Sequence, residues 1–337
     1  SCEPILKSVM PAGISISFGE HCTLGTKPAM LQNIVASSVV EDPSTGAITM
    51  RLDCQLRYKG DCHVDVECTV GSLVLTGLQI EGDLVVELVR LRKQPPWFSG
   101  IRVYFPNRPK LDLKVKSSLL GIWNANFSII QQRLVDVLLW VIASQTVLPN
   151  RFCLSMGQTI NEVDLRRPRP LGVLRLLVQE VQGLPDPGRS TWANLFRWRW
   201  SSKDEGSEEQ PEPPEVDPFV EISLGAQVLT TKVVRGSVNP KWDTDNLFDF
   251  LVDDPKRQNL SASVKCEKGR TFGGKHAELI GRTETTLSSL LEGQTEGQTE
   301  EGEMPSIWLP MRSGMLPVGS LRLRAQWRDI SSQGEMQ

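Results

Sequence analysis

The sequence predicts an α+β domain, built on a curved antiparallel sheet with one long helix, followed by an all-β sandwich. The chain has 337 residues, which is long for one domain and suits two that each bury a core. Apolar and polar residues alternate between residues 48 and 115, an amphipathic helix follows, and short strands then recur to residue 327. We place the domains at 1–163 and 171–330, with a linker at 164–170 and a tail at 331–337.

The predicted sheet of the first domain begins with two long, half-buried strands. In residues 48–57 every second side chain is apolar, which directs one set to a single face: Ile48, Met50, Leu52, Cys54 and Leu56. Residues 62–70 repeat this alternation. Further strands are expected at 73–80, 84–91, 100–105 and 111–115, with turns near Gly71, Gly82, Pro95-Pro96 and residues 107–109.

One amphipathic helix is expected at 126–145, with an apolar stripe of Phe127, Ile130, Leu134, Val137 and Val141. A single helix cannot cover all the long strands of this sheet. Either a segment preceding Ser1 completes an ordinary two-layer core, or a ligand fills the apolar face. We expect that a segment does precede Ser1, because the chain starts without Met and without a signal-peptide pattern.

Composition excludes several classes of protein. The 37 Lys and Arg residues nearly balance 40 Asp and Glu residues, so no overall positive charge favours nucleic acid. The seven cysteines form no CxxC pair, and we interpret them as reduced thiols of a cytosolic protein, with Cys54, Cys62 and Cys68 acting as small buried hydrophobes. The most apolar helical stretch, 134–142, is interrupted by Asp136 and is too short to span a membrane.

The second domain is expected to begin after the Pro- and Arg-rich linker DLRRPRP. Its strands are predicted at 173–181, 218–224, 228–234, 247–252, 260–266 and 320–327, a spacing typical of a sandwich. A long loop insertion is expected at 187–215. Its acidic part from residue 201, and the EGQT-containing stretch 292–303, have the composition of mobile loops.

Ordered sequence landmarks give both domains a family resemblance. The second domain resembles a C2 domain through LGVLRLLVQEVQGL at 171–184, DPFVEI at 217–222, VNPKW at 238–242 and LIG at 279–281. The first resembles the SMP domain of extended synaptotagmins, tricalbins and plant synaptotagmins, which precedes a C2 domain in those proteins. The matching segments are CTLGTKPAMLQNI at 22–34, WFSGIRVY at 97–104, residues 111–113, and VLPNRF at 147–152. We expect the first helix of the SMP fold to be missing before Ser1.

The resemblance implies a TULIP-like, lipid-binding SMP module that dimerises and carries glycerophospholipids in an apolar groove. It also implies an upstream anchor in the endoplasmic reticulum and work at membrane contact sites. A pure membrane tether is the alternative. Applied to this sequence, the resemblance predicts a groove lined by Ile48, Met50, Leu52, Leu56, Val64, Val66, Ile80, Ile101, Val103, Leu111 and Leu113.

The calcium-binding positions of the C2-like domain are degenerate. Asp186 and Asp217 match ligand positions in one loop, whereas the other loop carries Cys266, Lys268 and Glu278. Calcium requires six to eight oxygen ligands, which a thiol and an ammonium group do not provide. We therefore expect no metal and no cofactor beyond bound phospholipid as cargo, and membrane docking largely without calcium. Asp217 has an alternative role, as a turn former before Pro218.

Two groups of residues are candidates for membrane contact. The loop insertion concentrates aromatic and basic residues that suit an anionic membrane interface: Trp192, Phe196, Arg197, Trp198, Arg199 and Trp200. Alternatively, these rings pack onto the first domain or a partner chain. Lys232 and Arg235, with Lys241, form either a basic patch for phosphoinositides or an ordinary solvated face.

Enzymatic motifs are incomplete. GRTFGGKH at 269–276 resembles a P-loop, but His276 stands where Ser or Thr must hold magnesium. The sequence has no GxSxG or HExxH motif and only three histidines. We expect a protein that is not an enzyme, and a lipid-modifying enzyme with dispersed catalytic residues is the less favoured alternative.

Overall fold

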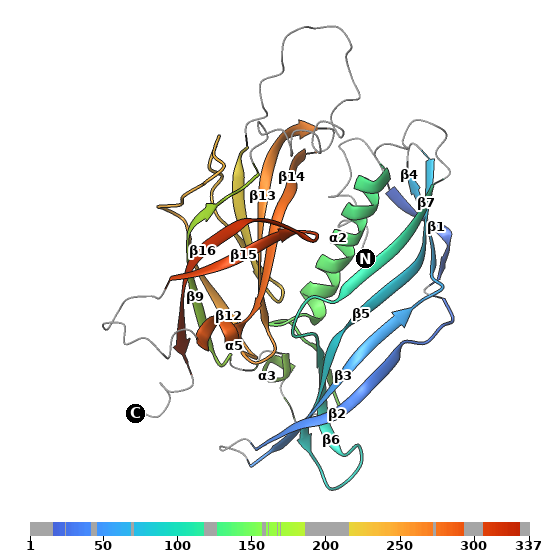
Figure 1. Cartoon of the computed structure of the whole chain (residues 1–337). Coiled ribbons are helices and arrows are strands. Elements are labelled where there is room, and N and C mark those ends of the chain that lie inside the picture. Colours follow the sequence, from blue (N-terminus) through green and yellow to red (C-terminus); the bar gives the residue numbers. More distant parts are fainter. Residues whose placement is uncertain are drawn as a thin grey trace, which may run out of the picture. The chain divides into compact units, whose positions relative to one another are not determined.

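The computed structural model describes residues 16–23, 25–41, 46–68, 71–117, 127–156, 160, 162–166, 168, 170–185, 216–271, 274–292 and 306–330. The chain divides into two compact units, Ser1–Arg169 and Pro170–Gln337. Within these ranges, each unit contains an eight-stranded sheet (Figure 1).

The first unit is one curved antiparallel sheet, as the alternating sequence pattern predicts. Its central path runs in the order β1-β4-β5-β3-β2, β6 and β7 pair with the other edge of β5, and β8 pairs with β6. The strands are β1 (Ile16–Thr23), β2 (Met30–Glu41), β3 (Ile48–Lys59), β4 (His63–Cys68), β5 (Gly71–Leu91), β6 (Phe98–Tyr104), β7 (Lys110–Ser117) and β8 (Phe152–Ser155).

Strand β5 is the central strand of this sheet, because it pairs with β3, β4, β6 and β7. The turn predicted near Gly82 is wrong. β5 runs unbroken for 21 residues, and Gly82 pairs with Leu56 of β3. A Cβ atom at Gly82 would lie 3.0 Å from Cβ of Pro109, so glycine permits a close approach of the chain here rather than a turn. Gly77, with φ of 62°, lies in a bulge between Thr76 and Gln79 that helps the long strand to curve.

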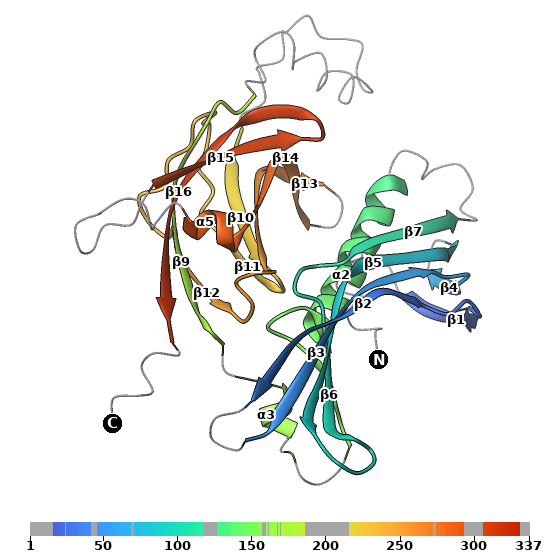
Figure 2. The ribbon, with the colours of Figure 1, turned by 60° about the horizontal axis from the view of Figure 1, so that its bottom comes forward.

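Helix α2 (Phe127–Thr146) matches the predicted helix within one residue. It lies alongside β7 and β5 in both ribbon views (Figures 1 and 2). On β7, Asp112 and Lys114 are exposed while Leu113 is only 2% exposed. Helix α2 therefore covers the apolar face of the sheet, on the β7 side.

The predicted linker is partly a structured element. Helix α3 (Glu162–Arg166) occupies its first three residues, and Leu165 is fully buried. A Cβ atom on Gly100 would lie 3.0 Å from the Leu165 side chain, so α3 packs directly on β6. The arginines and prolines around Leu165 favour a linker in the sequence, so this one apolar residue that packs on β6 was not predicted.

The second unit is a sandwich of two four-stranded halves in the part of the chain that is described. The halves β11-β10-β13-β14 and β15-β16-β9-β12 are joined by the single pair Arg282 and Arg312. Side chains from both halves form one core, including Ile222, Val264, Leu176, Phe250 and Leu323, all fully buried. The elements are β9 (Gly172–Gln182), β10 (Pro218–Leu224), β11 (Gln227–Thr230), β12 (Leu247–Val252), β13 (Asn259–Thr271), β14 (Gly274–Thr286), α5 (Leu287–Glu292), β15 (Ser306–Ser313) and β16 (Leu316–Asp329).

The strand predicted at 228–234 is shorter in the structure, where β11 ends at Thr230. The Thr231 amide still donates to the Val220 carbonyl, and the Thr231 hydroxyl accepts from the Val220 amide. This side-chain hydrogen bond replaces a regular ladder contact.

Candidate functional site

Cross-strand rows make one face of the first sheet continuously apolar. One row crosses four strands with the side chains Leu52, Val86, Val103 and Phe152. The neighbouring row consists of Met50, Leu88, Ile101 and Leu154. Because alternate residues of a strand share a face, these rows belong to a single surface, which we call the apolar face.

The backbone register places all the predicted groove positions on the apolar face. Ile48 and Leu56 lie on β3 with Met50 and Leu52. Ile80 pairs with Leu111, and Leu113 follows on β7. Val64 and Val66 pair with Leu75 and Leu73 of β5; the side chain of Val66 lies outside the described part of the structure.

Burial changes across the apolar face. Leu113, Cys54 and Leu84 are 2%, 5% and 8% exposed. Toward the other end, Phe152 is 57% exposed and Leu154 is 49% exposed, and Met50, Leu52, Ile101 and Val103 are half-buried. Exposed aromatic and aliphatic side chains in adjacent rows are unusual for a surface that meets only water.

Sequence reasoning missed the exposed margins of this face on β2 and β8. In β2 the register shifts between Gln32 and Val35, and again between Ala36 and Ser38. These irregularities break the period-two pattern, which is the signal for a strand. Strand β8 has only four residues, too few for periodicity to identify.

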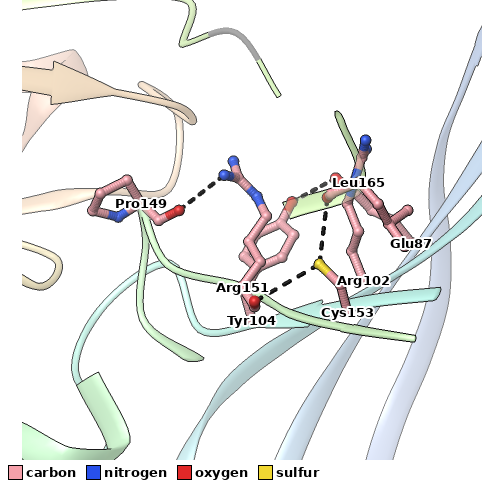
Figure 3. A network of polar contacts seen from close by, with 7 residues as sticks. All are labelled: Glu87, Arg102, Tyr104, Pro149, Arg151, Cys153 and Leu165. Carbon is pink, nitrogen blue, oxygen red and sulfur yellow. Dashed lines mark hydrogen bonds and ion pairs between the residues drawn. The ribbon is translucent and has the colours of Figure 1, made fainter. Parts of the chain in front are cut away.

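The opposite face carries a polar network in which Tyr104 is buried and the charged residues are half-buried (Figure 3). The Tyr104 hydroxyl donates to Glu87 Oε1 at 2.6 Å, and Arg102 Nη1 lies 3.2 Å from Glu87 Oε2. The guanidinium of Arg151 lies over the Tyr104 ring, 5.1 Å from its centroid. Burial, followed by the nearby Glu87 charge, raises the pKa of Tyr104 well above its ordinary value, so the phenol remains a hydrogen-bond donor.

This network fastens α3 to the sheet. Arg102 Nε donates to the Leu165 carbonyl oxygen at 2.7 Å, and the Cys153 thiol donates to the same oxygen at 3.3 Å. Burial raises the pKa of the Cys153 thiol, and a protonated thiol is a poor nucleophile. We interpret these residues as a structural clamp.

A hollow of about 210 Å³ also lies on the first unit. It is lined by Gln32, Gln55, Leu56, Arg57, Glu81, Gly82, Asp83 and Lys110. Arg57 Nη2 and Glu81 Oε1 are 2.7 Å apart within it, and the hydrogen bond and charge of Arg57 lower the pKa of Glu81. An acyl chain would have to displace these hydrated charges, so the hollow does not suit lipid tails.

In the second unit, the degenerate calcium positions lie on adjacent strands. Cys266 pairs with Pro218 on one side and with Glu278 on the other. The Asp217 carboxylate accepts the amide hydrogen of Gly236 at 3.1 Å, which matches the alternative of a turn-stabilising Asp. Across the described segments, no three His, Cys, Asp or Glu side chains are grouped to hold a metal. Asp186 and the side chain of Lys268 lie outside those segments.

Comparisons with known proteins match both units. The C2 domain family profile matches residues 172–302. Extended synaptotagmin-3 of Xenopus tropicalis is 27% identical over 295 residues, 84% of this chain and 28% of the relative. The Homo sapiens protein of that name is 26% identical over 290 residues, 85% of this chain and 28% of the relative. The chain is a homologue of the extended synaptotagmins.

The chain spans 28% of the length of these extended synaptotagmins. A solved structure, "Extended-Synaptotagmin 2, SMP - C2A - C2B Domains", is 19% identical and covers 93% of this chain and 57% of that one, with a TM-score of 0.49. Of the helices described for this homologue, none has the length and hydropathy needed to cross a membrane.

The predicted membrane-contact residues of this extended synaptotagmin homologue fall into two groups. Lys232 forms an ion pair with Asp245, Lys241 Nζ lies 3.4 Å from Glu180 Oε2, and Arg235 is exposed. The Lys232–Asp245 pair is exposed on both sides, and such pairs are weak and can exchange for lipid phosphates, whereas Glu180 is buried. The candidates of the loop insertion, from Trp192 to Trp200, lie outside the described residues.

Proposed function

We propose that this chain binds glycerophospholipids on the apolar face of its first unit and transfers them between membranes. The observation that carries the proposal is the uninterrupted pair of apolar rows, ending in the exposed side chains of Phe152 and Leu154. Each methylene group buried on such a surface contributes about 0.8 kcal/mol, so two acyl chains offset much of the cost of leaving a bilayer.

The arrangement of charge supports a carrier rather than an enzyme. The charged network of Glu87, Arg102 and Arg151 lies on the opposite face, where a lipid on the apolar face does not meet it. The proposed lipid therefore contacts side chains that neither donate nor accept protons. Homology to the extended synaptotagmins agrees with a carrier at membrane contact sites, on the cytosolic side of the endoplasmic reticulum.

The C2 domain is the proposed membrane-docking module. Because Asp217 is hydrogen-bonded to Gly236, and a thiol, Cys266, pairs with the next residue Pro218, these positions favour docking largely without calcium. The aromatic and basic loop residues from Trp192 to Trp200, together with Lys232 and Arg235, are the proposed contacts.

A pure tether is a second candidate, favoured by the edge strand β2. Its apolar residues are exposed on both sides of the strand, including Leu31 at 47%, Val35 at 58% and Val40 at 59%. A second copy of the chain could cover them, and the first unit would then act as a dimeric spacer. In that case the apolar face holds no lipid.

Native mass spectrometry of the purified chain, followed by organic extraction, separates these functions. A carrier retains glycerophospholipid in near-stoichiometric amounts, whereas an empty, folded protein supports the tether.

A matched pair of substitutions on β3 locates the lipid. Leu52→Trp fills the half-buried part of the apolar face, and Lys59→Trp adds the same ring to an exposed position on the other face. We expect Leu52→Trp to lose bound lipid and Lys59→Trp to keep it. Equal lipid content in both variants, with both folded, would contradict the assignment.

A further inference from the structure

The β5–β6 hairpin combines exposed apolar and basic side chains at its tip, residues 91–98. Trp97 is 57% exposed, Leu91 is 38% exposed, and both Arg92 and Lys93 are exposed. Residues 88–111 contain six Lys or Arg residues and no Asp or Glu. This stretch is basic even though the whole chain carries a formal net charge of −3.

The tip holds the Trp97 ring outward on a defined backbone. The Arg92 amide donates to the Trp97 carbonyl at 2.6 Å, and the Trp97 amide donates to the Gln94 carbonyl at 2.9 Å. Trp97 has a φ of 65° and Arg90 a φ of 55°, which are left-handed values that are costly for residues with bulky side chains. Burial of apolar surface does not explain this strained conformation, because the indole of Trp97 is exposed to water. Binding to a partner would explain it.

Two neighbouring elements add exposed apolar side chains near the tip. The Met156 amide donates to the Ser99 carbonyl at 2.9 Å, and the Met156 side chain is 37% exposed. Helix α3, which packs on β6, exposes 63% of Val163. In both ribbon views the hairpin projects at the end of the sheet away from β1 and β4 (Figures 1 and 2).

We propose that this hairpin tip inserts into the headgroup region of an anionic bilayer. An indole ring prefers the boundary between acyl chains and headgroups, and the two adjacent cations match acidic phospholipids in charge. Within the described residues no ion pair involves Arg92 or Lys93, so their charges are available to a membrane. The rows of the apolar face that end at Phe152 and Leu154 run on β6 and β8, next to this tip. If the proposed lipid carriage is correct, the tip brings the exposed margin of the apolar face to the membrane.

Quenching by brominated lipids tests insertion in the full chain. Vesicles of phosphatidylserine and brominated phosphatidylcholine quench only those indoles that reach the acyl region. We expect Trp97→Phe to reduce the quenching, because the inserted ring is removed. The matched control Trp140→Phe removes a ring that is 55% exposed on α2 and should leave the quenching unchanged.

Charge reversal tests the electrostatic part. In vesicle flotation, Arg92→Glu with Lys93→Glu should weaken binding to phosphatidylserine-containing vesicles by about thirtyfold or more, which corresponds to the loss of two basic residues at about 1 kcal/mol each. The control pair Lys59→Glu with Lys114→Glu makes the same charge change on exposed strand positions and should have little effect.

Three outcomes overturn the proposal: unchanged quenching in Trp97→Phe, equal binding of the two charge-reversed variants, or an effect of Trp97→Phe on oligomeric state alone. The last would identify the tip as a contact between copies. Lipid content measured by native mass spectrometry is a separate readout. An empty wild-type protein whose Trp97 is still quenched would refute the carrier and leave the membrane-inserting tip intact.

Discussion

Tyr104 shows how a single buried side chain stabilises the first unit. Its hydroxyl is held by Glu87, which is also paired with Arg102, so each group needs the others to remain satisfied. Replacing Tyr104 with Phe should cost about 1–3 kcal/mol, since it leaves the largely buried Glu87 carboxylate, 15% exposed, with one partner fewer. Calorimetric unfolding of the full chain should show the first unit's transition shifted down, with the second unit's unchanged.

A double-mutant cycle with Glu87→Gln supplies the control. If the hydroxyl and carboxylate act together, the two substitutions combined cost less than the sum of their separate effects. Strict additivity would show that the 2.6 Å contact contributes little.

Sequence analysis could not predict this network at the residue scale. Glu87, Arg102 and Arg151 are far apart in the chain, and only the register of β5, β6 and β8 brings them together. The prediction of small buried cysteines needed only local alternation, and it is confirmed for Cys54 and Cys62, at 5% and 4% exposure. The side chain of Cys68 lies outside the described residues.

At the scale of elements, the pairing of β9 with β12 includes an ion pair that should depend on pH. Arg175 donates to both Asp249 carboxylate oxygens at 2.7 Å, and these hydrogen bonds lower the pKa of Asp249. A lowered pKa in the folded state stabilises the fold above the ordinary pKa of Asp, and the contribution disappears as pH falls through the lowered value.

Asp249→Asn should therefore destabilise the second unit at neutral pH, and the difference should shrink as pH falls through the lowered pKa of Asp249. The side chain of Asp249 is 46% exposed, and solvent screening limits the loss to about 1 kcal/mol or less. Thermal unfolding of both proteins from neutral to acidic pH measures the difference. A constant difference at every pH would show that the charge is not responsible.

Regular elements were predictable, whereas irregular ones were not. Strand β10 and helix α2 agree with their predicted bounds to within one residue, because each follows a single clean period. The continuity of β5 was not predicted, because Gly82 was interpreted as a turn residue. Its actual role depends on Pro109, which lies in the connection between β6 and β7. The apolar face followed from alternation, but its exposed margin on β8 depended on pairing that no local pattern reveals.

For the whole chain, docking without calcium gives a direct prediction. Binding of the full chain to phosphatidylserine-containing vesicles should be the same in calcium and in a chelator, because Asp217 already binds the Gly236 amide and a thiol at Cys266 is a poor calcium ligand. Vesicle flotation measures this. Strong calcium dependence that is abolished by Asp217→Asn would contradict it.

Oligomeric state is also a property of the whole molecule, and our prediction of it rests on strand β2. β2 lies at the end of the path β1-β4-β5-β3-β2, with Ile34 60% exposed and Val40 59% exposed. An edge strand with unpaired backbone groups and exposed apolar side chains is suited to pairing with a second copy of the chain. We therefore expect a homodimer, and Ile34→Lys with Val40→Lys should convert it to a monomer, since charges at an edge oppose pairing.

Sedimentation velocity on the full chain measures this change. Gln55→Lys on the neighbouring strand β3 is the control for one added lysine away from β2. A dimer that survives both lysines at β2 would assign the interface to another surface. If the β2 variant becomes monomeric but retains its lipid, the apolar face holds its cargo without a second copy, and dimerisation serves to join two carriers rather than to build one.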